Sequence, residues 1–289
     1  MALDYAYYPG CASREITKEA DSSTKSVAAA LGIGLHDMPK ANCCGAGLLT
    51  DYDKDLWLTL NARIFAEAEQ MGMDILTICS TCLMVMSTAN KRLTDDPAEL
   101  ERINKALAKA GLKYSGNVKI KQLLWVLVDD LGINKLKAAV TVPLNHLKIA
   151  AFYGCHSLRP SDALGFDDPE TPHSLDVVIK ALGASSVDYI GKTKCCGFQV
   201  DLVTEETAIE MTGTRVCEAK SEGADCMVTP CPFCHTNLDS YQKMAEKQMS
   251  KKMNVPVFHL AQLVGLALGM DVGKLGLSRN MVSPEAILK

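Results

Sequence analysis

Two short stretches, "CCGAG" at residues 43–47 and "CCGFQ" at residues 195–199, divide this chain into two similar halves. In each stretch a pair of adjacent cysteines is followed directly by glycine. A single cysteine precedes each pair, and a C-x-x-C motif begins 35 positions after the second cysteine of either pair. Both halves therefore read C…CCG…CxxC, which indicates an internal duplication. The cysteines of the two halves are Cys11, Cys43, Cys44, Cys79 and Cys82, and Cys155, Cys195, Cys196, Cys231 and Cys234.

The sequence around the cysteines repeats as well. "YAYYPGC" precedes the first cysteine of one half and "IAAFYGC" that of the other, while "GMDILTICSTC" matches "GADCMVTPCPFC". A cysteine-free stretch separates the halves, and Pro143 interrupts the region that joins them. We therefore predict two domains, residues 1–143 and 144–289. Cys217 and Cys226 have no counterparts in the first half, so we expect them to be ordinary buried or helix-borne thiols.

Strands and helices are expected to alternate along each half. The apolar runs before the single cysteines and before the C-x-x-C motifs predict strands at 3–9, 74–80, 148–154 and 225–231. Helical periodicity closed by glycine predicts helices at 22–32, 59–72, 174–183 and 207–223. Residues 90–118 indicate a polar helical excursion, followed by an amphipathic helix at 121–137. The fold class is thus α/β, with two small, mainly parallel sheets flanked by helices. The cysteines lie at the carboxyl ends of strands, where open α/β sheets hold ligands.

The charge and hydropathy of the sequence argue against a nucleic-acid partner and against insertion into a membrane. The 289 residues include 30 Lys and Arg against 34 Asp and Glu, a formal net charge of −4, and no basic run suggests nucleic acid. The first residues lack the pattern of a signal peptide. The apolar run at 260–270 is far shorter than the roughly 20 residues that span a bilayer. We expect a cytoplasmic protein without direct membrane insertion.

Five thiols per half are one too many for most metal sites. A structural zinc site takes four ligands around one ion, and an ordinary 4Fe–4S cubane takes four cysteines. A vicinal disulfide between adjacent cysteines is strained. Adjacent thiolates suit a larger group with several metal atoms, and soft sulfur donors favour iron–sulfur chemistry. Zinc binding and dithiol or disulfide chemistry remain the alternatives at this point.

The whole pattern, C-x31-C-C-x34-C-x2-C followed by C-x39-C-C-x34-C-x2-C, resembles the duplicated cysteine-rich CCG domain found in the B-type subunit of heterodisulfide reductase, of the methanogen or the sulfur-oxidiser type. The resemblance covers almost the entire chain. It implies two pseudo-twofold-related domains, each holding one noncubane 4Fe–4S cluster through its five cysteines. Some relatives have proline after the first cysteine pair, where this chain has Gly45.

The resemblance also implies an activity and partners. The two clusters would cleave, or form, a disulfide that lies between them. A C-type subunit with cubane 4Fe–4S clusters and an A-type flavoprotein subunit would exchange the electrons. The substrate would be a small thiol or disulfide in methanogens, or lipoyl-bound sulfur in a sulfur-oxidising complex. The alternatives are a hydroxyacid-oxidising relative, acting on lactate or glycolate, and an electron-transfer subunit.

Polar side chains beside the cysteines are candidates for orienting an anionic substrate. They are Arg14, His156, Arg159 and Lys194. The guanidinium fork of arginine suits sulfonate, phosphate or carboxylate. A solvated or structural role is the alternative for each of them. His259, in "VFHLAQ", is expected to be an interior or helix-capping residue.

Overall fold

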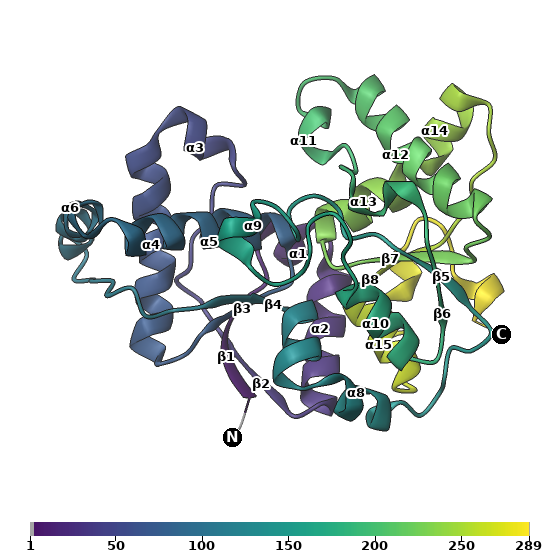
Figure 1. The fold of residues 1–289 in the computed structure, drawn as a ribbon, viewed down its shortest axis with the longest axis horizontal. Coiled ribbons are helices and arrows are strands. Elements are labelled where there is room, and N and C mark those ends of the chain that lie inside the picture. The colour runs from purple at the N-terminus through teal and green to yellow at the C-terminus, as the bar shows by residue number, and fades with distance from the viewer. Residues whose placement is uncertain (1–2, 289) are drawn as a thin grey trace.

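Each half of the chain builds one four-stranded parallel sheet in the computed structural model, which describes residues 3–288 (Figure 1). The two sheets have the same topology, with the first strand of each half second in the order. The first sheet is ordered β2-β1-β3-β4 and the second β6-β5-β7-β8. The strands are β1 Leu3–Tyr8, β2 Ile33–Asp37, β3 Ile75–Thr77 and β4 Ile120–Gln122, then β5 Lys148–Ala151, β6 Ser185–Val187, β7 Cys226–Thr229 and β8 Val257–His259.

Helices follow the strands and cover both sheets. In the first half they are α1 Cys11–Glu15, α2 Lys18–Ala30, α3 Leu48–Tyr52, α4 Lys54–Met71, α5 Ser80–Asp95, α6 Pro97–Ala108, α7 Leu123–Trp125, the π-helical turn Val126–Asp130 and α8 Ile133–Ala139. In the second half they are α9 Ser161–Leu164, α10 Ser174–Ala181, α11 Phe198–Asp201, α12 Glu205–Ser221, α13 Pro232–Ser240, α14 Gln242–Met249 and α15 Leu260–Ala267, with 3₁₀ turns at Ile190–Thr193, Leu277–Arg279 and Glu285–Ile287.

Local sequence explains the long helix α4. The side chain of Asp53 caps its start by accepting a hydrogen bond from the Leu56 N–H, and Gly72 ends it in the left-handed conformation. One face carries Trp57, Leu58, Ile64 and Phe65, which are buried. Helix α4 also holds the first cysteine pair, because the side-chain amide of Asn61 donates a hydrogen bond to the Cys44 carbonyl at 3.0 Å.

The predicted α/β architecture is confirmed, and the four predicted strand regions contain β1, β3, β5 and β7. One expectation is wrong: residues 121–137 do not form a single helix. Ile120 to Gln122 instead pair with β3 as a fourth strand, and the helix that follows breaks at Gly132, whose φ is +84°. Strand β4 has only three residues, which is too short a run to display the period-2 alternation that identifies a strand in a sequence.

The two halves share an extensive interface. Helix α2 of the first half packs against α15 of the second, α5 against α9, and α8 against α10 (Figure 1). An ion pair joins the ends of the chain, with the Arg279 Nε donating to the buried Glu19 Oε2 at 2.7 Å. Side chains on the facing ends of the two sheets are thereby held in fixed relative positions. The predicted boundary between residues 143 and 144 remains a prediction.

Candidate metal centre

The ten repeated cysteines follow strands of the two sheets: the single cysteines and the C-x-x-C motifs follow central strands, and the CCG pairs follow the edge strands β2 and β6. Cys11 begins α1 shortly after β1, and Cys155 follows β5. Cys79 and Cys231 are the N-cap residues of α5 and α13, so each C-x-x-C motif spans a helix start. The positive end of the helix dipole stabilises thiolates there. The parallel order of the strands thus gathers cysteines that are far apart in the sequence.

The thiols of the first half are in direct contact with one another. The Sγ atoms of Cys43 and Cys11 are 3.9 Å apart, and those of Cys44 and Cys82 are 3.5 Å apart. The Gly45 N–H donates to Cys43 Sγ at 3.4 Å. The first half therefore presents a continuous group of sulfur atoms, partly stabilised by the backbone.

The second half repeats this arrangement. Cys195 lies within hydrogen-bonding reach of Cys155, and Cys196 lies within reach of Cys234. The Gly197 N–H donates to Cys195 Sγ at 3.3 Å, as its counterpart does in the first half. Adjacent cysteines in both pairs point to different neighbours. Each CCG motif thereby connects the single cysteine to the C-x-x-C motif.

The contacts shift the pKa values of the thiols in opposite directions. The hydrogen bond with Cys11 lowers the pKa of Cys43 to about 2, and the hydrogen bond with Cys155 lowers that of Cys195 to about 2. The same hydrogen bonds raise the pKa values of Cys11 and Cys155. Each group can therefore carry a thiolate while its neighbours stay protonated, and the thiolate is the form in which cysteine binds soft metals.

Glycine after each cysteine pair is required by the backbone. Gly45 has φ of +92° and Gly197 has φ of +99°, a left-handed region that other residues rarely adopt. A Cβ on Gly197 would lie 2.8 Å from the backbone oxygen of Ala208 in α12. The loop can thus turn back sharply and direct its N–H at the preceding sulfur only with glycine in this position.

A second pair of glycines lets the chain approach the C-x-x-C sulfurs. A Cβ on Gly10 would lie 3.0 Å from the Sγ of Cys82, and one on Gly154 would lie 3.1 Å from the Sγ of Cys234. Both glycines come directly before the single cysteines. They bring those cysteines close to the helix starts that bear the C-x-x-C motifs.

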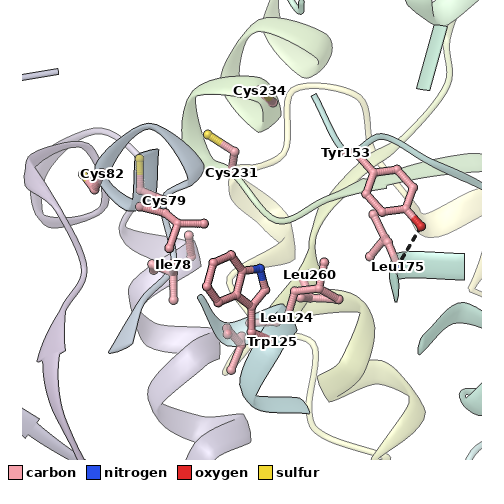
Figure 2. Packing of buried hydrophobic residues seen from close by; sticks show 14 of the residues in the cluster. Ile78, Cys79, Cys82, Leu124, Trp125, Tyr153, Leu175, Cys231, Cys234 and Leu260 are labelled. Carbon is pink, nitrogen blue, oxygen red and sulfur yellow. Dashed lines mark hydrogen bonds between the residues drawn. The ribbon is translucent and has the colours of Figure 1, made fainter. Parts of the chain in front are cut away.

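The two groups of thiols meet at the interface between the halves. Figure 2 shows Cys79 and Cys231 facing each other, and their side chains lie within hydrogen-bonding reach. Both are buried. The ten sulfur atoms therefore form one connected set across the interface. Within residues 3–288, no three His, Cys, Asp or Glu side chains are grouped as ligands of a single metal ion.

Two hydrogen bonds related by the duplication hold this interface. The Gln122 side-chain amide, at the end of β4, donates to the carbonyl of Pro230 at 2.9 Å, just before Cys231. The ring of His259, at the end of β8, bonds through Nε2 to the carbonyl of Ile78 at 3.2 Å, just before Cys79. Each half thus binds the strand end that carries the other half's C-x-x-C motif.

His259 also caps α15, as expected from the sequence. Its Nδ1 accepts a hydrogen bond from the Ala261 N–H, and Gln262 completes a capping box. Burial lowers the pKa of His259 to about 4, so the ring is neutral near pH 7. Because Nδ1 is an acceptor, the neutral ring carries its proton on Nε2. This N–H donates a hydrogen bond to the Ile78 carbonyl.

Replacing Gln122 with leucine is expected to lower the free energy of unfolding by about 1–3 kcal/mol, because the buried Pro230 carbonyl loses its donor. Chemical denaturation of the full chain measures this change. The matched control is Gln248→Leu, because Gln248 donates to the Glu206 carbonyl at 3.1 Å in an exposed position. Equal effects of the two variants would contradict the role given to Gln122.

The four candidate substrate residues have different surroundings. Arg14 is exposed and donates to the Met38 carbonyl, while Arg159 donates to the Pro169 carbonyl and pairs with Glu170. The two arginines therefore support loops in this structure. Lys194 is exposed, and its side chain has no hydrogen-bond or ion-pair partner within residues 3–288. Arg159 also donates to the Thr193 carbonyl at 3.4 Å, directly before Lys194, whereas Arg14 belongs to the first half.

His156 alone among the four lines a cavity with cysteines. The cavity measures about 20 Å³ and is bounded by the second cysteine group and by side chains from both halves. The His156 ring bonds to the Thr81 hydroxyl of the first half at 3.2 Å, and burial lowers its pKa. The sequence prediction missed Phe198, Gln199 and Phe233, which also line the cavity. The sequence offered a signal for all three, because Phe198 and Gln199 directly follow the second CCG motif and Phe233 lies inside the second C-x-x-C motif.

Cys217 and Cys226, which have no counterparts in the first half, lie where ordinary thiols were expected. Cys226 is buried within β7, and burial raises its pKa. Cys217 lies on α12 and is partly exposed.

Among residues 3–288, none of the helices is long and apolar enough to cross a membrane.

Comparison with known proteins agrees with the duplication. A family described as "Cysteine-rich domain", named CCG, matches residues 5–87 and again 149–239. The chain is 36% identical to the B-type subunit of the ferredoxin:CoB-CoM heterodisulfide reductase of Methanosarcina mazei, over 91% of this chain and 88% of the relative. It is 31% identical to a protein of Archaeoglobus profundus named as similar to the B-type subunit of heterodisulfide reductase, over 94% and 93%.

Two other similarities add to this comparison. The 8-methylmenaquinol:fumarate reductase membrane anchor subunit of Wolinella succinogenes is 42% identical, over 98% of both chains. A hypothetical protein from Helicobacter pylori shares the fold, with a TM-score of 0.79 at 15% identity over 98% of this chain. The present chain spans about half (52%) of that structure's length. The chain therefore belongs to the cysteine-rich CCG domain family, of which it carries two tandem copies, and its relatives include B-type subunits of heterodisulfide reductase.

Proposed function

We propose that this chain is the catalytic iron–sulfur subunit of a heterodisulfide reductase-like complex. The observation that carries the proposal is the joined set of ten thiols, which follow one another in the same order in both halves and meet at Cys79 and Cys231. Relatives named as B-type subunits of heterodisulfide reductase support it. The reaction class is reduction of a disulfide to two thiols with two electrons and two protons, or the reverse.

The ten cysteines are the proposed ligands of two noncubane 4Fe–4S clusters. Soft sulfur donors make up the ligand set, and five converge at each site, one more than a cubane needs. Such a group, when bound, supplies single electrons and iron sites for a substrate sulfur. The protein orients the ligands through the CCG loops and the N-caps of α5 and α13. The backbone N–H groups of Gly45 and Gly197 stabilise the thiolates of Cys43 and Cys195.

The partners and the direction of the reaction are also proposals, and they rest on the family resemblance. A C-type subunit with cubane clusters and an A-type flavoprotein subunit are the proposed source of electrons, in the cytoplasm. A small disulfide is the proposed substrate for a methanogen-type complex. Lipoyl-bound sulfur, oxidised in the reverse direction, is the substrate for a sulfur-oxidiser-type complex.

His156 is the proposed substrate-facing side chain. It lies beside Cys155, lines the cavity with Cys195, and is held by Thr81 of the other half. Its ring can donate a hydrogen bond to a polar group of a bound molecule. Arg14 and Arg159 are proposed to affect substrate binding indirectly, because they hold neighbouring loops in place. Lys194 is proposed to attract an anionic substrate through its solvent-exposed charge.

The proposal is tested by a disulfide reduction assay on the anaerobically reconstituted full chain. Reduced methyl viologen supplies electrons, and the released thiol is quantified. We expect two thiols for every two electrons consumed. We expect His156→Phe to raise the KM for the disulfide about tenfold with iron content unchanged, because one polar contact of about 1.4 kcal/mol is lost. The control Lys113→Gln, at an exposed lysine outside the site, is expected to change KM less than twofold. Iron-loaded protein that releases no thiol would contradict the catalytic role.

A second candidate function is electron transfer within a fumarate reductase. The relative that is 42% identical is named as the membrane anchor subunit of such an enzyme. Exposed apolar side chains occur on the loops after both CCG motifs, with Tyr52 88% and Val203 86% exposed. Figure 1 draws the two loops, at α3 and α11, on the same side of the molecule. Iron-loaded protein that reduces no disulfide but sediments with lipid vesicles would favour this function.

A further inference from the structure

Two pairs of sulfur atoms in the first half lie close together. The Sγ atoms of Cys44 and Cys82 are 3.5 Å apart, and those of Cys11 and Cys43 are 3.9 Å apart. A disulfide bond is about 2.05 Å long, so in either pair a rotation of the side chains has to bring the sulfur atoms closer before they can bond. Distance alone therefore favours the pair of Cys44 and Cys82.

Exposure to solvent favours the other pair. Cys11 and Cys43 are exposed, whereas Cys44 is 1% and Cys82 is 3% exposed. An oxidant in solution has to reach a sulfur atom before it can react, so access decides which thiol is attacked first. An accessible thiol beside a second thiol that can displace the oxidant is the arrangement of a redox-sensitive site. Of the two pairs, Cys11 and Cys43 meet both conditions.

The loop that carries Cys43 is fixed to the strand that leads to Cys11. The hydroxyl of Tyr8, the last residue of β1, donates to the Asn42 carbonyl at 2.9 Å, directly before Cys43. The side-chain amide of Asn42 in turn donates to the Leu60 carbonyl of α4 at 3.2 Å. The closeness of the two exposed sulfur atoms is thus built into the folded chain.

We propose that Cys11 and Cys43 form a reversible thiol-oxidation site, at which a small organic disulfide converts the two thiols into an intramolecular disulfide before metal binds. One cysteine attacks a sulfur of the oxidant and releases one thiol, which leaves a mixed disulfide. The other cysteine then attacks the modified sulfur and releases the second thiol. The two cysteine thiols lose two electrons and two protons, and the oxidant gains both.

The oxidised pair blocks metal loading of the first group. This consequence rests on the proposed function, in which Cys11 and Cys43 are two of the five ligands of that group. A cysteine binds metal as a free thiolate, and the disulfide removes two of them. Thiols restore a disulfide, whereas sulfonic acids are irreversible products. The pair therefore keeps its exposed sulfur atoms recoverable.

The first experiment treats the reduced, metal-free full chain with a short pulse of oxidised glutathione. Non-reducing peptide mass spectrometry maps the linkages, and fragment spectra separate Cys43 from Cys44. We expect the Cys11–Cys43 linkage to form at least tenfold faster than the Cys44–Cys82 linkage. If the buried pair is linked as fast or faster, exposure does not select the site and the proposal is wrong.

The variant Cys11→Ser tests whether Cys11 is the second thiol. Without it, Cys43 is expected to keep the glutathionyl group, so this mixed disulfide accumulates at least tenfold over the wild type. The matched control is Cys217→Ser, because Cys217 is a partly exposed thiol on α12, and its loss is expected to leave the Cys11–Cys43 linkage rate unchanged. A folded Cys11→Ser chain, checked by circular dichroism, with no more glutathione on Cys43 than the wild type would overturn the role of Cys11.

The iron-loaded chain separates this proposal from the proposed function. We expect the Cys11–Cys43 linkage to form at least tenfold more slowly than in the metal-free chain, while Cys217 gains glutathione at an equal rate in both. A linkage that forms equally fast with and without iron contradicts the ligand role of the two cysteines and leaves the oxidation site standing. A metal-free chain in which both cysteines gain glutathione without becoming linked overturns the oxidation site, whatever iron the chain binds.

Discussion

Replacing Cys44 with serine is expected to remove about half of the iron from the reconstituted chain. Cys44 is buried, and its Sγ lies 3.5 Å from that of Cys82, so it connects the CCG motif to the C-x-x-C motif of its group. A hydroxyl is a harder donor than a thiolate and retains iron–sulfur clusters poorly. Cys196→Ser is expected to remove the other half. Iron and acid-labile sulfide per chain, with electron paramagnetic resonance spectra, measure both losses.

The control for the cysteine variants is Cys226→Ser. Cys226 is also buried, but it lies within β7 and has no counterpart in the first half. The iron content of the Cys226→Ser chain is expected to equal that of the wild type. If Cys44→Ser and Cys196→Ser both keep the full iron content and two unaltered spectra, the second cysteine of each pair is not a ligand.

Replacing Gly197 with alanine is expected to lower the free energy of unfolding by about 2–4 kcal/mol. The left-handed backbone costs about 1 kcal/mol or more for a residue with a Cβ, and overpacking against the backbone of α12 adds about 1–3 kcal/mol. The Ala208 oxygen, 2.8 Å from the added carbon, belongs to a helix and cannot move aside as a flexible side chain does. Chemical denaturation of the metal-free chain measures the loss.

Two other glycines separate the causes of this effect. Gly223 has φ of +84° and open space around the Cβ position, so Gly223→Ala carries only the backbone cost of about 1 kcal/mol. Gly45→Ala meets only the side chain of Leu49, at 2.9 Å, which can shift, and an intermediate loss is expected. If the Gly197→Ala chain is no less stable than the Gly223→Ala chain, the contact with α12 adds nothing to the loss in the free energy of unfolding.

The duplication and the candidate ligands could be predicted from the sequence because both rest on fixed spacings. The step from Cys44 to Cys79 and from Cys196 to Cys231 is the same, and equal steps along similar folds bring residues to equivalent places. The strands before the cysteines were predictable for a similar reason. They are central in their sheets, buried on both faces and rich in apolar residues.

Contacts between the halves could not be predicted in this way. Gln122 lies in a short edge strand that the sequence favours as helix, and its partner carbonyl at Pro230 is 108 positions away. The role of His259 as a cap followed from local sequence, but its bond to Ile78, 181 positions away, did not. Such pairings depend on how two folded units meet, which no local periodicity encodes.

The difference between the two halves at the aromatic pair was visible in the sequence but lacked an interpretation. Phe198 and Phe233 stand beside cysteines in the aligned halves, yet only the folded chain stacks them at 3.7 Å. The repeat predicts what the halves share. At matching positions such as Ala46 and Phe198 the halves differ, and the repeat alone does not predict what these differences do.

The central claim is that each half of the chain holds one iron–sulfur cluster through its five cysteines. The most direct test is the metal and sulfide content of the anaerobically purified and reconstituted full chain, with Mössbauer spectra of the ⁵⁷Fe-loaded protein. We expect about eight iron and about eight acid-labile sulfide atoms per chain, as two 4Fe–4S groups require. One or two zinc atoms per chain, with neither iron nor sulfide, would contradict it.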